Sequence, residues 1–180
     1  MNSTKTITAT ITSIRKFYSG KRLLLDFMEE FDATDSIFVG NTMNGLFLIP
    51  SENRQSINYL PRKFRFNAGA IHQYVASPSG VKYLDELIPG DEIIISTQAQ
   101  LKTAPVARTK CEIRDFVKIE AIADNNTFSV ILQDGDTTAL LTPQGLKYLA
   151  ELNPGTPVLV RLYDHATHLG NPIDEFCEEK

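Results

Sequence analysis

The sequence predicts an all-β protein, made mainly of β-strands with single-turn helices and organised as two or three repeated small β-barrel-like units. Three observations lead to this fold class. One segment of the chain is repeated, short β-branched runs alternate with Pro/Gly turns, and no stretch keeps helical periodicity beyond about two turns.

The repeat lies in two segments separated by 65 positions. Residues 75–95 read VASPSGVKYLDELIPGDEIII, and residues 140–160 read LLTPQGLKYLAELNPGTPVLV, with nine identities in 21 positions. A weaker third copy spans residues 25–39. Two strands joined by a turn cannot bury their own apolar face, so we expect the units to pack on one another and the segments 75–95 and 140–160 to superpose.

Each unit is expected to contain the same local elements. A β-rich run ends in a Pro/Gly turn, and one helical turn, KYLDEL or KYLAEL, follows. A second Pro-Gly turn then precedes a β-branched strand, Ile93–Ile95 or Val158–Val160. Further strands are predicted at Thr6–Ile14, Leu46–Ile49, Phe116–Ala123 and Thr127–Leu132.

These elements suggest three units along the chain. Residues 1–66 form an N-terminal unit that ends in a basic connecting loop, residues 67–123 contain the first repeat segment, and residues 124–180 contain the second. The loop from Arg54 to Arg65 carries four basic residues, so it either binds a phosphate or carboxylate or is simply a solvated loop.

Composition limits the functional classes. The 180 residues are 42% hydrophobic and 22% charged, with a net charge of −4, which excludes disordered and fibrous classes and argues against a nucleic-acid partner. There is neither an apolar run of about 18 residues nor an apolar leader, so we expect no membrane partner and a cytoplasmic location. Two cysteines form neither a disulfide framework nor a CxxC metal site.

Common catalytic and nucleotide-binding motifs are missing. The chain has no GxGxxG, GxxxxGK[ST], HExxH or GxSxG pattern. Without a Gly-rich turn between a strand and a helix, tight binding of NAD to this chain alone is not expected.

Four ordered stretches nevertheless carry a specific signal. They read VGNTMNGLFLIPSE (39–52), FRFNAGAIHQYV (64–75), VARTKCEIRDFVKIEA (106–121) and SVILQDGDTTALLTPQG (129–145). Together they resemble the archaeal-type (class II) 3-dehydroquinate synthase family and its 3-amino-4-hydroxybenzoate synthase relatives. Family members are much longer, and this chain resembles only their C-terminal part.

Three departures from the family motifs suggest a different substrate or a specialised role. Pro50 stands where the family's HSE segment has His, Asp134–Thr137 replaces an NAET segment, and Thr167 replaces the Arg of an RHFG segment.

Four residues on the matched motifs form the predicted catalytic and metal set. His72 and His168 suit proton transfer, and Glu52 and Glu120 together with both histidines would suit a divalent metal such as Mg²⁺ or Mn²⁺. We expect Glu52, His72, Glu120 and His168 to line one cleft. The alternative is a packed histidine and surface carboxylates.

Four further residues are predicted to bind substrate. Arg108 and Lys110 suit an acidic group on a sugar-derived substrate, and strand alternation places them on one face with Glu112. Gln133 and Asp136 suit substrate hydroxyls, although capping of a turn is an equal alternative for this pair.

The resemblance implies a truncated enzyme or enzyme subunit. Its chemistry would be metal-assisted cyclisation, of aldol or elimination type, on a sugar-derived keto acid in aromatic or secondary-metabolite biosynthesis. A partner chain would then supply the missing N-terminal half. The alternative is a non-catalytic β-module that serves as a scaffold or completes a site with a partner protein.

Overall fold

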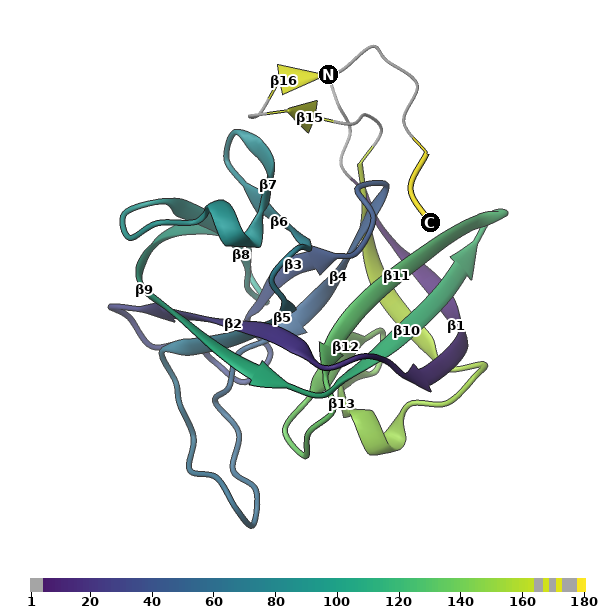
Figure 1. The fold of residues 1–180 in the computed structure, drawn as a ribbon, viewed down its shortest axis with the longest axis horizontal. Helices are drawn as coiled ribbons and strands as arrows, with labels where there is room; N and C mark the ends of the chain where they lie inside the picture. Colours follow the sequence, from purple (N-terminus) through teal and green to yellow (C-terminus); the bar gives the residue numbers. More distant parts are fainter. Residues whose placement is uncertain (1–4, 164–166, 169–170, 173–177) are drawn as a thin grey trace.

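The computed structural model describes residues 5–163, 167–168, 171–172 and 178–180. Their regular structure consists of β-strands and two short turns of 3-10 helix, which confirms the predicted all-β class (Figure 1). In that part of the chain no helix is long and apolar enough to cross a membrane.

The elements follow one another along the chain with short connections. The strands and helical turns are β1 (Thr6–Lys16), β2 (Gly20–Phe27), β3 (Ser36–Gly40), β4 (Gly45–Pro50), β5 (Arg65–Ala70), β6 (Tyr74–Ser77), β7 (Gly80–Tyr83), η1 (Leu84–Glu86), β8 (Glu92–Ser96), β9 (Leu101–Arg114), β10 (Phe116–Ala123), β11 (Asn126–Gln133), β12 (Ala139–Thr142), β13 (Gly145–Tyr148), η2 (Leu149–Glu151), β14 (Pro157–Leu162), β15 (Thr167–His168) and β16 (Asn171–Pro172).

One curled antiparallel sheet of 12 strands dominates the described residues. Its order is β11-β10-β1-β14-β4-β3-β8-β9-β2-β5, and the β6–β7 hairpin is attached through β3. Two smaller pairs, β12–β13 and β15–β16, lie outside this sheet. The apolar core fills the inside of the curl, where three buried phenylalanine rings pack with centroids 4.9 to 5.7 Å apart: Phe27, Phe31 and Phe66.

The two repeat segments contain the same elements in the same order. Residues 75–95 run through β6, β7, η1 and β8, and residues 140–160 run through β12, β13, η2 and β14. The N–H of Leu84 donates to Gln73 at 2.8 Å, and the N–H of Leu149 donates to Thr138 at 2.8 Å, so the same bond recurs at the offset of 65. Superposition of the segments and the division into three units stay predictions. Strands from all three ranges join the one sheet.

The helical turns are shorter than the KYLDEL and KYLAEL patterns predict. Tyr83 pairs with Tyr74 and Tyr148 pairs with Ala139, so each Lys-Tyr pair completes a hairpin strand. The 3-10 turns therefore begin only at Leu84 and Leu149.

Gln73 links the two ends of the sheet. Its side chain is fully buried, its Nε2 donates to the carbonyl of Ile131 on β11 at 2.8 Å, and its Oε1 accepts the Ile131 N–H at 2.7 Å. The same Nε2 also lies 3.3 Å from the carbonyl of Ala68 on β5. One amide side chain thus takes the place of a backbone pairing between β5 and β11.

Gly69 allows this close approach. A Cβ at this position would lie 2.2 Å from the carbonyl oxygen of Ile131, and the residue has a φ of +78°. Both the spacing and the backbone conformation therefore require glycine.

We expect Gln73→Leu to lower the free energy of unfolding by about 2–4 kcal/mol, because both backbone groups of Ile131 would stay buried without partners. Gln100→Leu, an exposed control, should change it by less than about 0.5 kcal/mol. Urea unfolding measures both, and equal midpoints for the two variants would contradict the role of Gln73.

Candidate functional site

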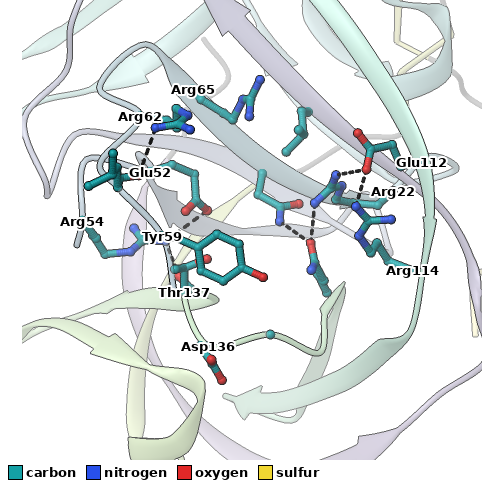
Figure 2. Close-up of a pocket in the computed structure, with 15 residues that line it drawn as sticks. Arg22, Glu52, Arg54, Tyr59, Arg62, Arg65, Glu112, Arg114, Asp136 and Thr137 are labelled. Atoms are coloured by element: carbon teal, nitrogen blue, oxygen red, sulfur yellow. Dashed lines mark hydrogen bonds and ion pairs between the residues drawn. The ribbon is translucent and has the colours of Figure 1, made fainter. Parts of the chain in front are cut away.

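A cavity of about 240 Å³ lies where β2, β5 and β9 meet two loops, residues 51–64 and 134–138 (Figure 2). Its lining is rich in charge: the guanidinium groups are Arg22, Arg54, Arg62, Arg65 and Arg114, and the carboxylates are Glu52, Glu112 and Asp136. Five cations against three anions leave an excess of two positive charges in a protein whose net charge is −4. The lining is therefore suited to an anionic ligand.

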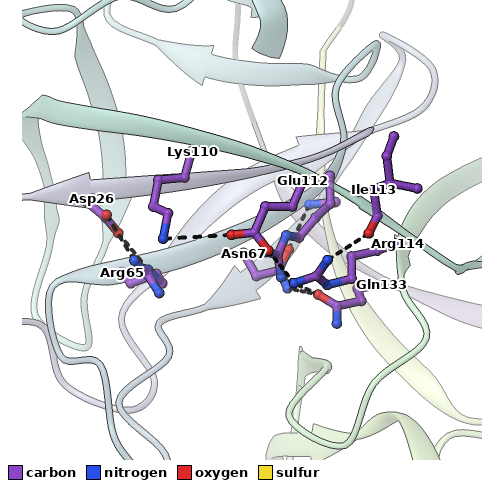
Figure 3. A network of polar contacts seen from close by, with 10 residues as sticks. Asp26, Arg65, Asn67, Lys110, Glu112, Ile113, Arg114 and Gln133 are labelled. Atoms are coloured by element: carbon purple, nitrogen blue, oxygen red, sulfur yellow. Dashed lines mark hydrogen bonds and ion pairs between the residues drawn. The ribbon is translucent and has the colours of Figure 1, made fainter. Parts of the chain in front are cut away.

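At one end of the cavity lies a group of three cations around a single carboxylate, which we call the Glu112 cluster: Arg22, Glu112 and Arg114, which line the cavity, and Lys110 at its border. Arg22 lies 3.3 Å from Glu112, and Lys110 lies 3.7 Å from it on the same strand, as alternation predicts (Figure 3). Arg114 also pairs with Glu112, and its positive charge is the main cause that holds the pKa of Glu112 below its usual value.

Arg22 is fixed by neutral side chains as well as by Glu112. Its Nη1 donates to Oε1 of Gln133 at 2.6 Å, and Nδ2 of Asn67 donates to the same oxygen at 2.9 Å. The Arg22 side chain is only 8% exposed, and its Nε has no hydrogen-bond partner within the described residues. Burial, followed by repulsion from Arg114, lowers the pKa of Arg22.

The other end of the cavity lies around Glu52, which β4 and the following loop place there. The backbone N–H of Glu52 donates to the backbone carbonyl of Arg65 at 2.7 Å, and the backbone N–H of Arg62 donates to the carbonyl of Glu52 at 2.8 Å. Arg54 lies 3.2 Å from the Glu52 carboxylate and donates to the carbonyls of Ser51 and Thr137. Burial raises the pKa of Glu52, although Arg54 opposes this, and burial lowers the pKa of Arg54.

Arg62 differs from the other arginines of the cavity. Its guanidinium donates to the carbonyl of Leu60 at 3.5 Å and forms no ion pair among the residues described. It is exposed at the mouth of the cavity and is therefore available to an external anion.

Asp26 holds two cations beside the cavity. Its carboxylate accepts from Arg65 at 2.7 Å and from Nε of Arg108 at 2.9 Å. Burial alone would raise the pKa of Asp26, but the hydrogen bonds from the two arginines outweigh burial and keep it below its usual value.

The cavity contains several of the residues predicted from sequence. Glu52, Gln133 and Asp136 line it, and Arg108 and Lys110 belong to ion pairs at its border. The basic loop that ends at Arg65 supplies part of its wall. Arg22 and Asn67 lie outside the residues singled out from sequence.

Of the described side chains in the predicted catalytic and metal set, Glu52 lines the cavity, and His72 and Glu120 lie elsewhere. Glu120 lies on β10 outside the cavity lining, where it pairs with Arg15 at 3.1 Å and Lys118 at 3.3 Å. His72 lies in the turn before β6 and contacts Oδ1 of Asn41 at 2.6 Å. His168 is placed by its backbone in β15, and its side chain lies outside the described part of the chain.

The shared metal site stays a prediction. Among the described residues, no three His, Cys, Asp or Glu side chains are grouped so as to hold a metal ion, and Glu52 is engaged by Arg54. Binding of Mg²⁺ or Mn²⁺ stays a prediction, and no chemical step is assigned to it.

Comparison with known proteins adds a family relationship. Residues 8–180 match a family model described as the 3-dehydroquinate synthase II C-terminal domain. The chain is 37% identical over 175 residues to a 3-dehydroquinate synthase of Methanocorpusculum labreanum, which covers 96% of this chain and 51% of the relative. A 3-dehydroquinate synthase of Natronomonas pharaonis is 35% identical over 175 residues, covering 96% and 45%.

A third relative, the 3-dehydroquinate synthase of Methanosarcina barkeri, is 36% identical over 174 residues, which is 96% of this chain and 46% of the relative. The chain thus spans about half the length of the curated relatives it matches. No solved structure matches.

We expect Asp26→Asn to lower the free energy of unfolding by about 2 kcal/mol at neutral pH, because two guanidinium groups would lose a buried anion. The pKa of Asp26 is lower in the folded than in the unfolded chain, where it is about 3.9. Its stabilising contribution is therefore complete above about pH 4 and is lost as the pH falls through the folded-state pKa.

Urea unfolding of wild type and Asp26→Asn over an acidic pH series tests this dependence, with the exposed Asp134→Asn as the control. The difference in the free energy of unfolding between wild type and Asp26→Asn should become smaller as the pH falls. A difference that stays constant would contradict the assignment.

Proposed function

The chain belongs to the 3-dehydroquinate synthase II family, and we propose that it supplies the substrate-binding half of a synthase-type site through the arginine-rich cavity. The supporting observation is the excess of two positive charges in a cavity with several further hydrogen-bonding groups. A sugar-derived keto acid carries one carboxylate and several hydroxyl groups, and both kinds of group would find partners there.

The carboxylate would bind at the mouth of the cavity. The Arg62 guanidinium forms no ion pair among the described residues, and Arg65 lies beside it with its position fixed by Asp26. Guanidinium groups bind carboxylates in a bidentate manner, which would set the orientation of the acid group.

The hydroxyl groups would face the opposite wall. Gln133 uses its carbonyl oxygen for Arg22 and Asn67, which leaves its amide NH₂ group to donate. Asp136 from the adjacent loop offers a carboxylate acceptor, whereas the side chain of Thr137 beside it hydrogen-bonds Glu52. A polyol placed between Arg62 and this wall would therefore be bound through both donors and acceptors.

A second protein segment would complete the catalytic site. The relatives named as 3-dehydroquinate synthases are about twice as long as the matched region, since it covers 45% to 51% of them. We propose that a partner chain corresponding to their N-terminal half supplies reacting groups, and that the present chain contributes binding and orientation.

Titration calorimetry with 3-dehydroquinate tests the binding role. We expect binding by wild type and about tenfold weaker binding by Arg62→Gln, because one charge-assisted interaction is worth about 1.5 kcal/mol or more. Lys63→Gln is the matched control, since it removes the same charge at the next position, where the side chain does not line the cavity.

The neutral cyclic polyol myo-inositol should bind far more weakly than 3-dehydroquinate. Equal affinity for the two compounds, or equal affinity of Arg62→Gln and Lys63→Gln for 3-dehydroquinate, would contradict a carboxylate site at Arg62.

A further inference from the structure

We propose that Tyr59 determines the specificity of the cavity by packing its aromatic ring against the carbon face of a ring-shaped ligand. This inference rests on the proposed function, in which the acid group of the ligand binds at Arg62. The ligand class is then a polyhydroxy acid in ring form, either a carbocycle or a cyclised sugar acid.

The first argument is the position of Tyr59 over the cavity. Tyr59 lies in an arm, residues 55–61, that belongs to the long connection between β4 and β5, and this connection extends away from the sheet (Figure 1). Among the described residues that line the cavity, Tyr59 is the one aromatic side chain. In Figure 2 its ring lies between the labelled Glu52 and Arg22, so it faces the space between the two charged ends.

The second argument is the way in which the arm is attached. At its base, Arg54 donates to two backbone carbonyls, and the backbone N–H of Arg62 donates to the carbonyl of Glu52 at 2.8 Å. At its tip, a single hydrogen bond among the described residues joins the arm to the loop across the mouth, from Nδ2 of Asn58 to Asp136 at 3.4 Å. The tip can therefore move toward a ligand while the base stays in place.

The third argument is the apolar surface that the arm presents to solvent. Tyr59 and Leu60 are 57% and 66% exposed, although both line a cavity whose other groups are mostly charged. Contact with carbon atoms of a ligand would remove this surface from water, which is favourable. The polar wall and Arg62 offer no such contact, so the arm adds a second kind of recognition to the site.

A ring-shaped polyhydroxy acid has the surface that matches Tyr59. In a six-membered ring, several C–H groups are held together on one side, and such groups pack against the negative face of an aromatic ring. An open-chain acid has no fixed face and loses more conformational entropy when it is ordered. The hydroxyl groups would bind at Gln133 while Tyr59 covers the opposite side of the ring.

Calorimetric titrations with three acids test the proposal: 3-dehydroquinate is a carbocycle, glucuronate is a six-carbon sugar acid in ring form, and gluconate is a six-carbon acid with an open chain. We expect Tyr59→Ser to bind 3-dehydroquinate and glucuronate about fivefold more weakly than wild type, because the stacking contact is lost. Gluconate should bind to wild type more weakly than either ring acid, and its affinity should be the same for Tyr59→Ser.

Two further variants separate the aromatic ring from the rest of the arm. Tyr59→Phe keeps the ring and should bind all three acids as wild type does. Ile57→Ser is the matched control, since Ile57 lies on the same arm, is fully exposed and does not line the cavity. It should leave every affinity unchanged. Circular dichroism and urea unfolding confirm that each variant is folded.

The outcomes separate this inference from the proposed function. If Tyr59→Ser binds 3-dehydroquinate as wild type does while Arg62→Gln binds it more weakly, the inference is wrong and the carboxylate site stays intact. An equal loss of affinity for gluconate and for the ring acids would also overturn the inference. A loss for 3-dehydroquinate alone would support it and restrict the ligand class to carbocycles. If wild type binds none of the three acids, the proposed function itself is wrong.

Discussion

The side chain of Gln73 closes the fold, and the cavity depends on that closure. β5 and β11 are the two ends of a long antiparallel sheet, and an open end would expose unpaired backbone groups to other chains. Gln73 donates to and accepts from the same residue, Ile131, so the two ends are joined without a regular strand pairing. The contact is possible because Gly69 leaves room for the carbonyl of Ile131. Closure thus depends on the buried amide of Gln73 and on the lack of a side chain at Gly69.

Closure also assembles the cavity from distant parts of the sequence. Gln133 lies two residues beyond Ile131 on β11 and therefore shares its face of the strand. Once Ile131 is fixed against β5, the side chain of Gln133 lies against Asn67 on β5 and Arg22 on β2. The loop after β11 then brings Thr137 to Arg54. The same contact that completes the sheet thereby positions one wall of the binding site.

Sequence patterns within a short segment predicted those elements whose structure depends on that segment alone. The apolar run Phe116–Ala123 is found as β10 with the same bounds, and the Arg54–Arg65 loop contributes to the arginine-rich wall of the cavity. Local patterns could not predict the contact between Arg22 and Gln133, because these residues are 111 positions apart and meet only when the sheet closes. Glu120 is a second such case. Alternation along β10 directs Glu120 to the same outward face as Gln133, but it pairs there with Arg15 and Lys118 and is not among the residues that line the cavity, which a local pattern could not show.

The arginines of the cavity are held in place before any ligand arrives. Asp26 fixes Arg65, Glu112 and Gln133 fix Arg22, and two carbonyls fix Arg54. The carboxylates among these acceptors reduce the net charge available to a ligand, but all of the acceptors restrict the long side chains beforehand, so that less conformational entropy is lost on binding. The carboxylates Asp26 and Glu112 thus pair with neighbouring arginines and offset the repulsion between them in the absence of a ligand. Arg62 pairs with no carboxylate among the described residues, so an ion pair with the acid group of a ligand would be its first. The result is a rigid polar wall facing one adaptable cation, which is the arrangement that the proposed binding role requires.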